Sequence, residues 1–249
     1  MGEHWYKPNG DSCYEMPKKN GSGLRPVTLR DARKLNLYPS VTGIMSEMAA
    51  PALEMWKIKQ AVTASRGLRK RKDETDDQFA MRANAKAKEA LQARAEQGTN
   101  THDAMEQYFI GEPISSEYIV MVDNMLSAMD MAGIGNEEWK AENSFARNGY
   151  GGKVDLHSAN VVLDFKTKER WDKPPILYDN HFMQIAAYRR GLGLPDARGF
   201  IMFLNEETQG AHLVEVTKPQ LEKGWAMFRA CLMLWQAKRG YHPEEEDES

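Results

Sequence analysis

The sequence has only two cysteines, Cys13 and Cys231, and neither belongs to a Cys-x-x-Cys pair. Zinc and iron–sulfur sites built on clustered cysteines are therefore excluded by ligand count. Two free thiols are the simpler expectation, although a single disulfide between them stays open. The chain also lacks a Gly-x-x-x-x-Gly-Lys-Ser/Thr loop, so it has no built-in ATP motor.

Long apolar runs are missing as well. No segment approaches the roughly 18 residues needed to cross a bilayer, and Met1–Gly10 lacks the apolar stretch of a secretory signal. We therefore expect a cytoplasmic protein, in the host cytoplasm if the source is viral, without a membrane partner. The 249 residues, 41% of them hydrophobic, suffice for one packed domain with a helical addition.

Neither sign of charge dominates, because the formal net charge is only −3. Locally, residues 66–72 hold five Lys or Arg, and residues 73–77 hold four Asp or Glu. This run could contact nucleic-acid phosphates, with Arg69 and Lys70 as candidate contacts, or it could be a solvated loop neutralised by its acidic neighbours. The two alternatives carry equal weight.

The periodicity of apolar residues changes near Gly135. Before it, helices are predicted over 51–62, 75–97, 101–110 and 118–132, with Gly98 ending the second of them. After it, strands are predicted over 139–147, 152–157, 160–166, 199–204 and 212–216, with helices over 179–191 and 219–239. This order predicts an α/β (α+β) protein with a mixed β-sheet core flanked by helices. The expected divisions are a flexible N-terminal arm (1–30), a helical region (31–135), the core (136–240) and an acidic disordered tail (241–249).

The predicted second and third strands carry two carboxylates and a lysine. Asp164 and Lys166 are two positions apart, so they share a face of their strand, while Leu163 and Phe165 point into the core. If the preceding strand is the hairpin partner, Asp155 lies across from Asp164. Phosphodiester hydrolysis uses such a set: carboxylates hold a hard divalent ion, and a lysine orients or deprotonates the attacking water. An Asp-x-Lys pair alone is more often a surface pair.

Two predicted helices carry further candidate site residues, each pair spaced four positions apart so that it shares a helix face. Gln184 and Tyr188 are four residues apart on helix 179–191, and His102 and Glu106 are four apart on helix 101–110. The ordinary interpretations are a surface polar residue for glutamine and a structural residue for a lone histidine. A histidine on a capped helix, upstream of a carboxylate-rich sheet, is also a candidate metal ligand.

Taken in order, these elements resemble the RecB-like branch of the PD-(D/E)XK nuclease superfamily. The matching motifs are Gly-x-x-x-His-x-x-x-Glu, a glutamate, Gly-Gly-x-x-Asp, Asp-x-Lys-Thr and Gln-x-x-x-Tyr, over residues 98–188. The earlier Tyr-Pro-Ser-Val-Thr-x-Ile at 38–44 is similar to the start of phage exonucleases and of the mitochondrial genome maintenance exonuclease. The resemblance implies a restriction-endonuclease-like fold whose N-terminal helices form a wall or arch over the site.

The resemblance also implies the members of the metal site. Asp155 and Asp164 match the metal-binding carboxylates, and Lys166 matches the catalytic lysine. His102 matches a histidine that completes the metal site in this branch, and the backbone carbonyl of Phe165 matches a further ligand. The implied cofactor is Mg²⁺ or Mn²⁺, as one or two ions, without an iron–sulfur cluster and without ATP.

The resemblance also implies which residues contact the nucleic acid. Gln184 and Tyr188 match helix residues that support the site and contact the nucleic acid, and Lys168 and Arg189 follow the motifs closely enough to reach phosphates. Glu142 lies where the family often has an acidic residue on the first core strand, although a solvent-facing strand glutamate is the more common explanation.

The implied activity is that of a metal-dependent deoxyribonuclease. An exonuclease that acts on single-stranded or duplex DNA ends is favoured, in phage-type recombination, replication or repair, with recombination or replication proteins as partners. A structure-specific endonuclease is one alternative. A non-catalytic nucleic-acid-binding module that kept the fold is another, and the motifs do not separate DNA from RNA.

Overall fold

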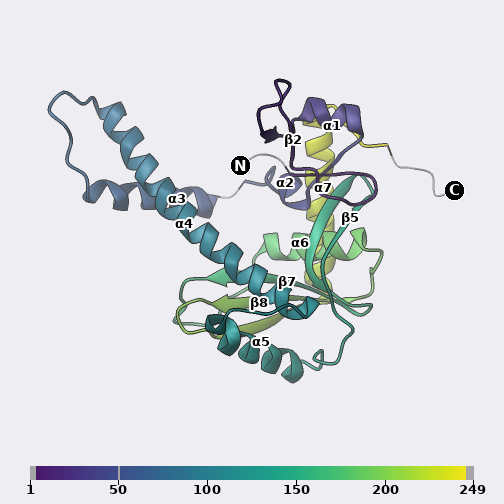
Figure 1. The fold of residues 1–249 in the computed structure, drawn as a ribbon. Helices are drawn as coiled ribbons and strands as arrows, with labels where there is room; N and C mark the ends of the chain where they lie inside the picture. The colour runs from purple at the N-terminus through teal and green to yellow at the C-terminus, as the bar shows by residue number, and fades with distance from the viewer. Residues whose placement is uncertain (1–3, 50, 245–249) are drawn as a thin grey trace. The chain divides into compact units, whose positions relative to one another are not determined.

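The computed structural model describes residues 4–49 and 51–244, and the chain divides into two units. The larger unit comprises Met1–Glu47 together with Ala104–Ser249, and the smaller unit comprises Met48–Asp103. The position of one unit relative to the other is not determined (Figure 1). Each is therefore described by itself.

The larger unit is built on a five-stranded sheet in which the strands follow one another in sequence order. The strands are β5 (Lys140–Arg147), β6 (Tyr150–His157), β7 (Val161–Lys168), β8 (Arg198–Asn205) and β9 (Ala211–Val216). Only β7 and β8 run parallel, because helix α6 (Asp179–Gly191) connects them; the other neighbours are antiparallel. The predicted mixed sheet and its strand–helix order are confirmed.

Helices cover both faces of this sheet (Figure 1). On one face α5 (Ile119–Met131) and the end of α4 (Asp76–Ile110) form a core with the sheet, in which Met105 and Met125 lie with Phe165 and Phe200. On the other face α6 lies between the sheet and α7 (Lys218–Arg239). The predicted fold class, a mixed sheet flanked by helices, is therefore confirmed.

Helix α6 is enclosed closely enough to bury every residue from His181 to Tyr188. Gly224 of α7 permits this approach, since a Cβ there would lie 2.3 Å from the carbonyl oxygen of Phe182. Glycine has no such atom, so the backbone of α7 can approach the backbone of α6 at Phe182 and Met183. The polar members of α6 are therefore held in fixed positions above the sheet.

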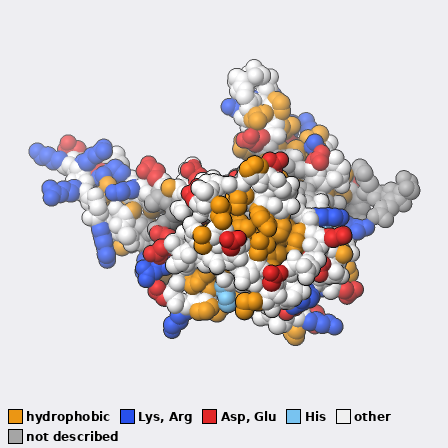
Figure 2. Space-filling view, turned by 60° about the horizontal axis from the view of Figure 1, so that its bottom comes forward, with side chains coloured by type: hydrophobic (Ala, Val, Ile, Leu, Met, Phe, Trp, Pro, Cys, Tyr) orange, Lys and Arg blue, Asp and Glu red, His pale blue; other side chains and the backbone are white. Residues whose placement is uncertain are grey.

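The outer surface of α5 is partly apolar. Ile119, Val120 and Met131 are exposed, and Figure 2 shows hydrophobic side chains gathered on the face that comes forward from the bottom of Figure 1, where α5 lies. Scattered exposed apolar residues are normal on soluble domains. Within residues 4–49 and 51–244, no helix combines the length and the hydrophobicity required to span a membrane.

Both ends of the described chain pack into the larger unit. Strand β1 (Trp5–Tyr6) pairs with β4 (Tyr38–Pro39), and the fully buried Trp5 ring contacts Trp235 of α7 and Tyr241. Residues 1–30 were expected to form a loose arm, but this buried aromatic contact docks their first strand. At the other end, the backbone of Glu244 bonds to the Asn36 side chain. The predicted disordered tail, 241–249, is therefore ordered up to Glu244; residues 245–249 lie outside the described residues.

The remaining elements of the larger unit are short. They are β2 (Glu15–Pro17), β3 (Leu24–Pro26), α1 (Leu29–Leu35), α2 (Val41–Met45) and the 3-10 helix Ser116–Tyr118. Helix α2 packs against α6 and β6, so the Tyr-Pro-Ser-Val-Thr segment supports the strand that carries Asp155. Cys13 and Cys231 are both free thiols.

The smaller unit consists of α3 (Pro51–Arg66) and the first part of α4, joined by the basic loop. Arg82 of α4 fixes this loop through a two-pronged bond to Glu74. The prediction that Gly98 ends a helix is wrong, because α4 continues through it. A helical glycine costs only about 1 kcal/mol, and the Thr101 hydroxyl donates to the Gln97 carbonyl instead of capping a new helix.

The docking of the N-terminal strand can be tested by truncating its anchor. Trp5→Ala is expected to lower the free energy of unfolding by about 3–5 kcal/mol, as for other buried large aromatics. Leu24→Ala is the matched control, because Leu24 is 56% exposed, and it should change stability by about 0.5 kcal/mol or less. Urea denaturation followed by circular dichroism measures both. Equal stability of the two variants would contradict the docking.

Candidate active site

Asp155 and Asp164 are brought together by the pairing of β6 with β7. The ladder joins Leu156 with Leu163 and His157 with Val162, and the same register extended by one position sets Asp155 opposite Asp164. There the Oδ2 atom of Asp155 accepts a hydrogen bond from the backbone N–H of Phe165, with an N···O distance of 2.7 Å. The Asp155 carboxylate is thereby fixed against the strand that carries Asp164.

Lys166 completes this group from the same strand as Asp164. Its Nζ lies 2.6 Å from Oδ2 of Asp164, whose side chain is only 2% exposed. The intervening Phe165 is buried in the core on the opposite face, as strand alternation predicts. Although the distance is short, Oδ2 of Asp164 receives no hydrogen bond of acceptable geometry. Lys166 and Asp164 therefore form an ion pair, and Oδ2 of Asp164 can still accept a hydrogen bond or bind a cation.

Two carboxylates share one ammonium group here, and the pKa values of Asp155 and Lys166 reflect it. Burial, followed by repulsion from Asp164, raises the pKa of Asp155 to about 7, although Lys166 and the Phe165 N–H oppose the shift. Burial alone would lower the pKa of Lys166, but attraction to Asp164 and Asp155 outweighs it and the pKa is raised. Lys166 is therefore protonated at neutral pH, and the site holds an excess of negative charge.

These donors fit a hard divalent cation. Asp164 offers a buried oxygen without an aligned hydrogen bond, and the repulsion felt by Asp155 is what a nearby cation relieves. Mg²⁺ often uses one or two carboxylates and completes its coordination with water. Among the described residues no three His, Cys, Asp or Glu side chains gather as a metal cluster. Asp155 and Asp164 are therefore the candidate carboxylate donors that lie together in the larger unit.

His102 belongs to the smaller unit, on α4. Since the two units are not placed relative to one another, its approach to the carboxylates stays a prediction. The same holds for a wall or arch formed by the N-terminal helices. The role of the Phe165 carbonyl as a ligand also stays a prediction.

Helix α6 brings Gln184 and Tyr188 to the carboxylates. The Nε2 of Gln184 donates to the Tyr188 hydroxyl, with an N···O distance of 2.9 Å, and both side chains are buried. Burial, followed by repulsion from Asp164 and Asp155, raises the pKa of Tyr188 well above its ordinary value. Gln184 is therefore not the exposed polar residue that helix statistics favour.

The Gly-Gly pair before Asp155 has a packing role. A Cβ on Gly152 would lie 3.0 Å from Cε1 of Tyr188 and 2.9 Å from the Phe145 ring. A Cβ on Gly151 would lie 2.7 Å from the Tyr6 ring. Gly152 thus makes room on β6 for the tyrosine of α6, and the Gly-Gly-x-x-Asp and Gln-x-x-x-Tyr motifs meet through this contact.

His181 is a member of this group that the sequence analysis missed. Its Nδ1 accepts the backbone N–H of Tyr178 at 3.0 Å, and its ring centroid lies 5.6 Å from that of Phe203. Phe203 pairs with Lys166 in the parallel β7–β8 ladder. Burial, followed by repulsion from Lys166, lowers the pKa of His181 to about 4, so the ring is neutral and carries its proton on Nε2. The available signal was its position three residues before Gln184 on one helix face.

Glu142 lies at the level of Asp155 on the neighbouring strand. The β5–β6 ladder pairs Ala141 with Leu156 and Asn143 with Val154, on either side of these two residues. Glu142 has a φ of 53° and forms an ion pair with Lys153 of β6. A non-glycine residue in this region stores about 1–3 kcal/mol of strain. Lys153 also lowers the pKa of Asp155, so Glu142 is linked to the site through that lysine.

The other residues predicted to contact nucleic acid lie in three different parts of the structure. Lys168 Nζ lies 5.4 Å from the centroid of the Phe203 ring, which His181 also contacts. Arg189 instead lines a pocket between α6 and α7. Arg69 and Lys70 lie in the loop of the smaller unit, where Lys70 pairs with Asp76 at 2.6 Å. The partial neutralisation of the basic run is therefore real.

Comparisons with known proteins give distant likenesses only. No protein-family model matches the sequence, and no curated protein matches it. Among solved structures, the protein SSO0001 is 17% identical, with a TM-score of 0.30 over 45% of this chain and 57% of its own. A protein from Eubacterium rectale, provisionally named an exonuclease, is 12% identical, with a TM-score of 0.40 over 59% of this chain and 68% of its own. A phage-related exonuclease from Haemophilus somnus 129PT is 11% identical, with a TM-score of 0.29 over 72% of this chain and 94% of its own.

This chain thus spans little more than half the length of the first of these proteins. At such identities and TM-scores, the activity has to be argued from the residues of the chain itself.

The raised pKa of Asp155 predicts how stability depends on pH. Folding raises this pKa from 3.8 to about 7, so the stability contributed by protonated Asp155 is full below about pH 4 and is lost as pH rises to about 7. Asp155→Asn retains an acceptor for the Phe165 N–H but cannot ionise. Its free energy of unfolding relative to wild type should therefore rise by about 1.4 kcal/mol per pH unit across that window.

Urea denaturation in metal-free buffer at several pH values measures this difference. Asp123→Asn, at an exposed position of α5, is the control and should follow wild type throughout. A difference between Asp155→Asn and wild type that stays constant from pH 4 to 7 would show that Asp155 titrates normally.

Proposed function

We propose that this protein is a metal-dependent nuclease that hydrolyses phosphodiester bonds of DNA, with Asp155, Asp164 and Lys166 at its catalytic centre. The observation that carries the proposal is the meeting of buried Asp164 and partly buried Asp155, from neighbouring strands, with Lys166, whose Nζ lies 2.6 Å from Asp164. An ordinary strand ion pair is exposed and self-contained. This group is largely withdrawn from solvent, with Asp164 buried, and it is short of positive charge, which suits a cation and a phosphate.

Asp155 and Asp164 are the residues that would hold Mg²⁺ or Mn²⁺, with the Phe165 carbonyl and His102 as further candidate ligands. Such an ion, when bound, supplies neutralisation of the phosphate and a lower pKa for bound water. Lys166 is already protonated at neutral pH, because its pKa is raised. Its role is therefore to orient the attacking water and to offset charge on the phosphate, rather than to remove a proton.

The α6 side chains supply the substrate side of the proposed site. Gln184 donates to the oxygen of Tyr188, which leaves the phenolic hydrogen of Tyr188 available to donate elsewhere. Tyr188 stays neutral, since its pKa is raised. His181 has its Nδ1 occupied by the Tyr178 N–H, and its Nε2–H is the second neutral donor. Lys168 adds positive charge near the same ring of Phe203.

Exonuclease action on DNA ends is the preferred form of the activity, because the motifs resemble those of end-processing enzymes. The corresponding setting is phage-type recombination, replication or repair. A structure-specific endonuclease remains the second candidate. Covalently closed circular DNA separates the two, since an exonuclease requires an end and an endonuclease does not.

The catalytic assignment predicts loss of cleavage in two variants. Asp164→Ala removes a metal ligand and Lys166→Ala removes the water-orienting charge, so each should reduce the rate on end-labelled linear DNA by about 100-fold or more in Mg²⁺ or Mn²⁺. Asp123→Ala and Lys223→Ala remove the same side-chain types at exposed positions and should retain wild-type rates. Wild type without metal-dependent cleavage, or unchanged rates in both site variants, would sink the nuclease assignment.

The role of His181 can be tested with two substitutions, to asparagine and to glutamine, which place a side-chain amide at different distances from the backbone. His181→Asn places its oxygen near the former Nδ1 and keeps an acceptor for the Tyr178 N–H, but it loses the donor at Nε2. His181→Gln extends its amide toward the former Nε2 position. The Asn variant should lose about tenfold in kcat, equivalent to one hydrogen bond in the transition state, and the Gln variant should recover part of it. DNA affinity in EDTA should stay near wild type, and equal kcat in all three proteins would contradict the role.

A further inference from the structure

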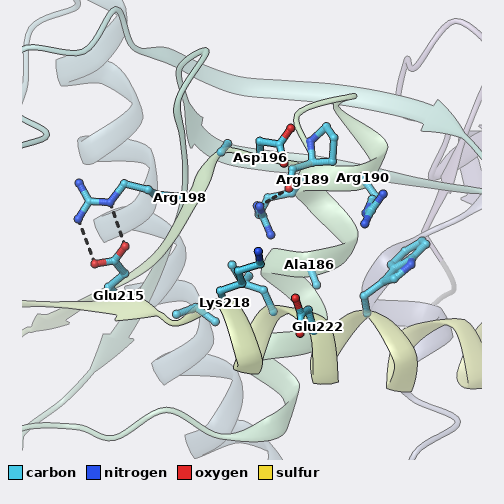
Figure 3. A pocket seen from close by; sticks show the side chains of 13 residues that line it. Ala186, Arg189, Arg190, Asp196, Arg198, Glu215, Lys218 and Glu222 are labelled. Carbon is cyan, nitrogen blue, oxygen red and sulfur yellow. Dashed lines mark hydrogen bonds and ion pairs between the residues drawn. The ribbon is translucent and has the colours of Figure 1, made fainter.

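A cavity of the larger unit lies between α6, α7 and the start of β8 (Figure 3). Its volume is about 450 Å³. Charged side chains of both signs line it: Arg189, Arg190, Arg198 and Lys218 are basic, and Asp196, Glu215 and Glu222 are acidic. The nuclease proposal assigns no role to this cavity.

The cavity and the carboxylates involve different residues of α6: Ala186, Arg189 and Arg190 line the cavity, whereas Gln184 and Tyr188 lie toward the carboxylates. Toward the start of the helix His181 packs on Phe203, which pairs with Lys166. At the other end the Cδ of Arg189 lies 3.8 Å from the position that a Cβ on Gly199 would take. Phe203 and Gly199 are four residues apart on β8, which corresponds to about 13 Å along the strand. The two sites are therefore separate but on one helix.

Two of the arginines in the cavity already have partners. Arg198 forms a two-pronged ion pair with Glu215, with N···O distances of 2.9 and 3.0 Å. The guanidinium of Arg190 lies over the ring of Trp225 at 5.6 Å. A planar guanidinium on an aromatic face keeps its edge available to an anion.

Arg189 is the arginine whose charge is least compensated. One of its terminal nitrogens donates to the carbonyl of Pro195. Its Nε is buried and has no hydrogen-bond acceptor among the described residues. Burial, followed by repulsion from Arg190, lowers the pKa of Arg189, while Asp196 acts in the opposite direction. A buried donor without an acceptor is costly, so this group favours an anion.

Lys218 directs a second positive charge to the same space. Figure 3 shows the side chain of Lys218 and the guanidinium of Arg189 pointing toward one another. Like charges repel, and the acidic lining residue on the same helix as Lys218 is Glu222, one turn further along α7. A tetrahedral oxyanion between the two cations would satisfy both and would accept from the Nε of Arg189.

We propose that this cavity binds a phosphate group between Arg189 and Lys218, with Arg190 at its edge. Several acceptor oxygens on one phosphate match a guanidinium edge and an ammonium group at once. The phosphate can belong to a nucleic-acid strand or to a free phosphate monoester such as a mononucleotide, and both present the same chemistry. This site is independent of metal and of cleavage.

Isothermal titration calorimetry with inorganic phosphate, on the full chain in EDTA, tests the site directly. Lys218→Gln and Arg189→Gln should each weaken binding by about tenfold or more, because each removes a charged contact to the anion. Glu222→Gln removes the competing carboxylate and should tighten binding. Lys223→Gln changes the next lysine of α7, outside the cavity, and should bind as wild type does. Circular dichroism checks that Arg189→Gln is folded.

The source of the phosphate is separated by fluorescence anisotropy in the same buffer. A labelled oligonucleotide is bound with a 5′-phosphate or a 5′-hydroxyl, and dAMP competes. Weaker oligonucleotide binding in Lys218→Gln supports the site with a strand as its ligand, whereas a loss limited to inorganic phosphate and dAMP supports it with a free monoester. The proposal is overturned if wild type binds none of these probes saturably, or if Lys218→Gln and Glu222→Gln bind equally. Since no metal is present, these outcomes do not depend on whether wild type cleaves DNA.

Discussion

The central constraint of this structure is the enforced proximity of two carboxylates. The β6–β7 register sets Asp155 opposite Asp164, and the Phe165 N–H holds one of them in place. Lys166 compensates only part of their charge, as the raised pKa of Asp155 records. Proteins seldom bury uncompensated charge without a reason connected with function. The pairing of β6 with β7 and the packing of α6 on the sheet keep the two carboxylates close despite their repulsion.

Helix α6 covers the face of the sheet on which these carboxylates lie. It is packed between the sheet and α7, and it can approach both because Gly152 and Gly224 carry no side chains. Its enclosure restricts the side chains of His181 and Gln184, and hydrogen bonds with the Tyr178 N–H and the Tyr188 hydroxyl orient them. The next turn presents Arg189 to the cavity beside α7. One helix therefore carries residues of both the proposed metal site and the proposed phosphate site.

The sequence was sufficient where periodicity or spacing carried the information. Strand alternation correctly placed Asp164 with Lys166 and Phe165 in the core, and helical spacing joined Gln184 to Tyr188. It failed where distant packing decided the outcome. The burial of Trp5 depends on aromatic partners more than 200 positions away. The place of His181 depends on Phe203, which only the parallel β7–β8 register brings beside Lys166.

The protonation states also determine how the group can work. Lys166 gives its charge to Asp164, so Asp155 is the carboxylate whose ionisation is most costly near neutral pH. If a divalent cation binds to the pair, as proposed, it would displace a proton from Asp155 as well as water. The attraction between the cation and the two carboxylates would offset the cost of ionising Asp155 beside Asp164. Cation binding and proton release would then be coupled at Asp155, while Lys166, whose pKa is raised, would keep its proton and act by charge and position.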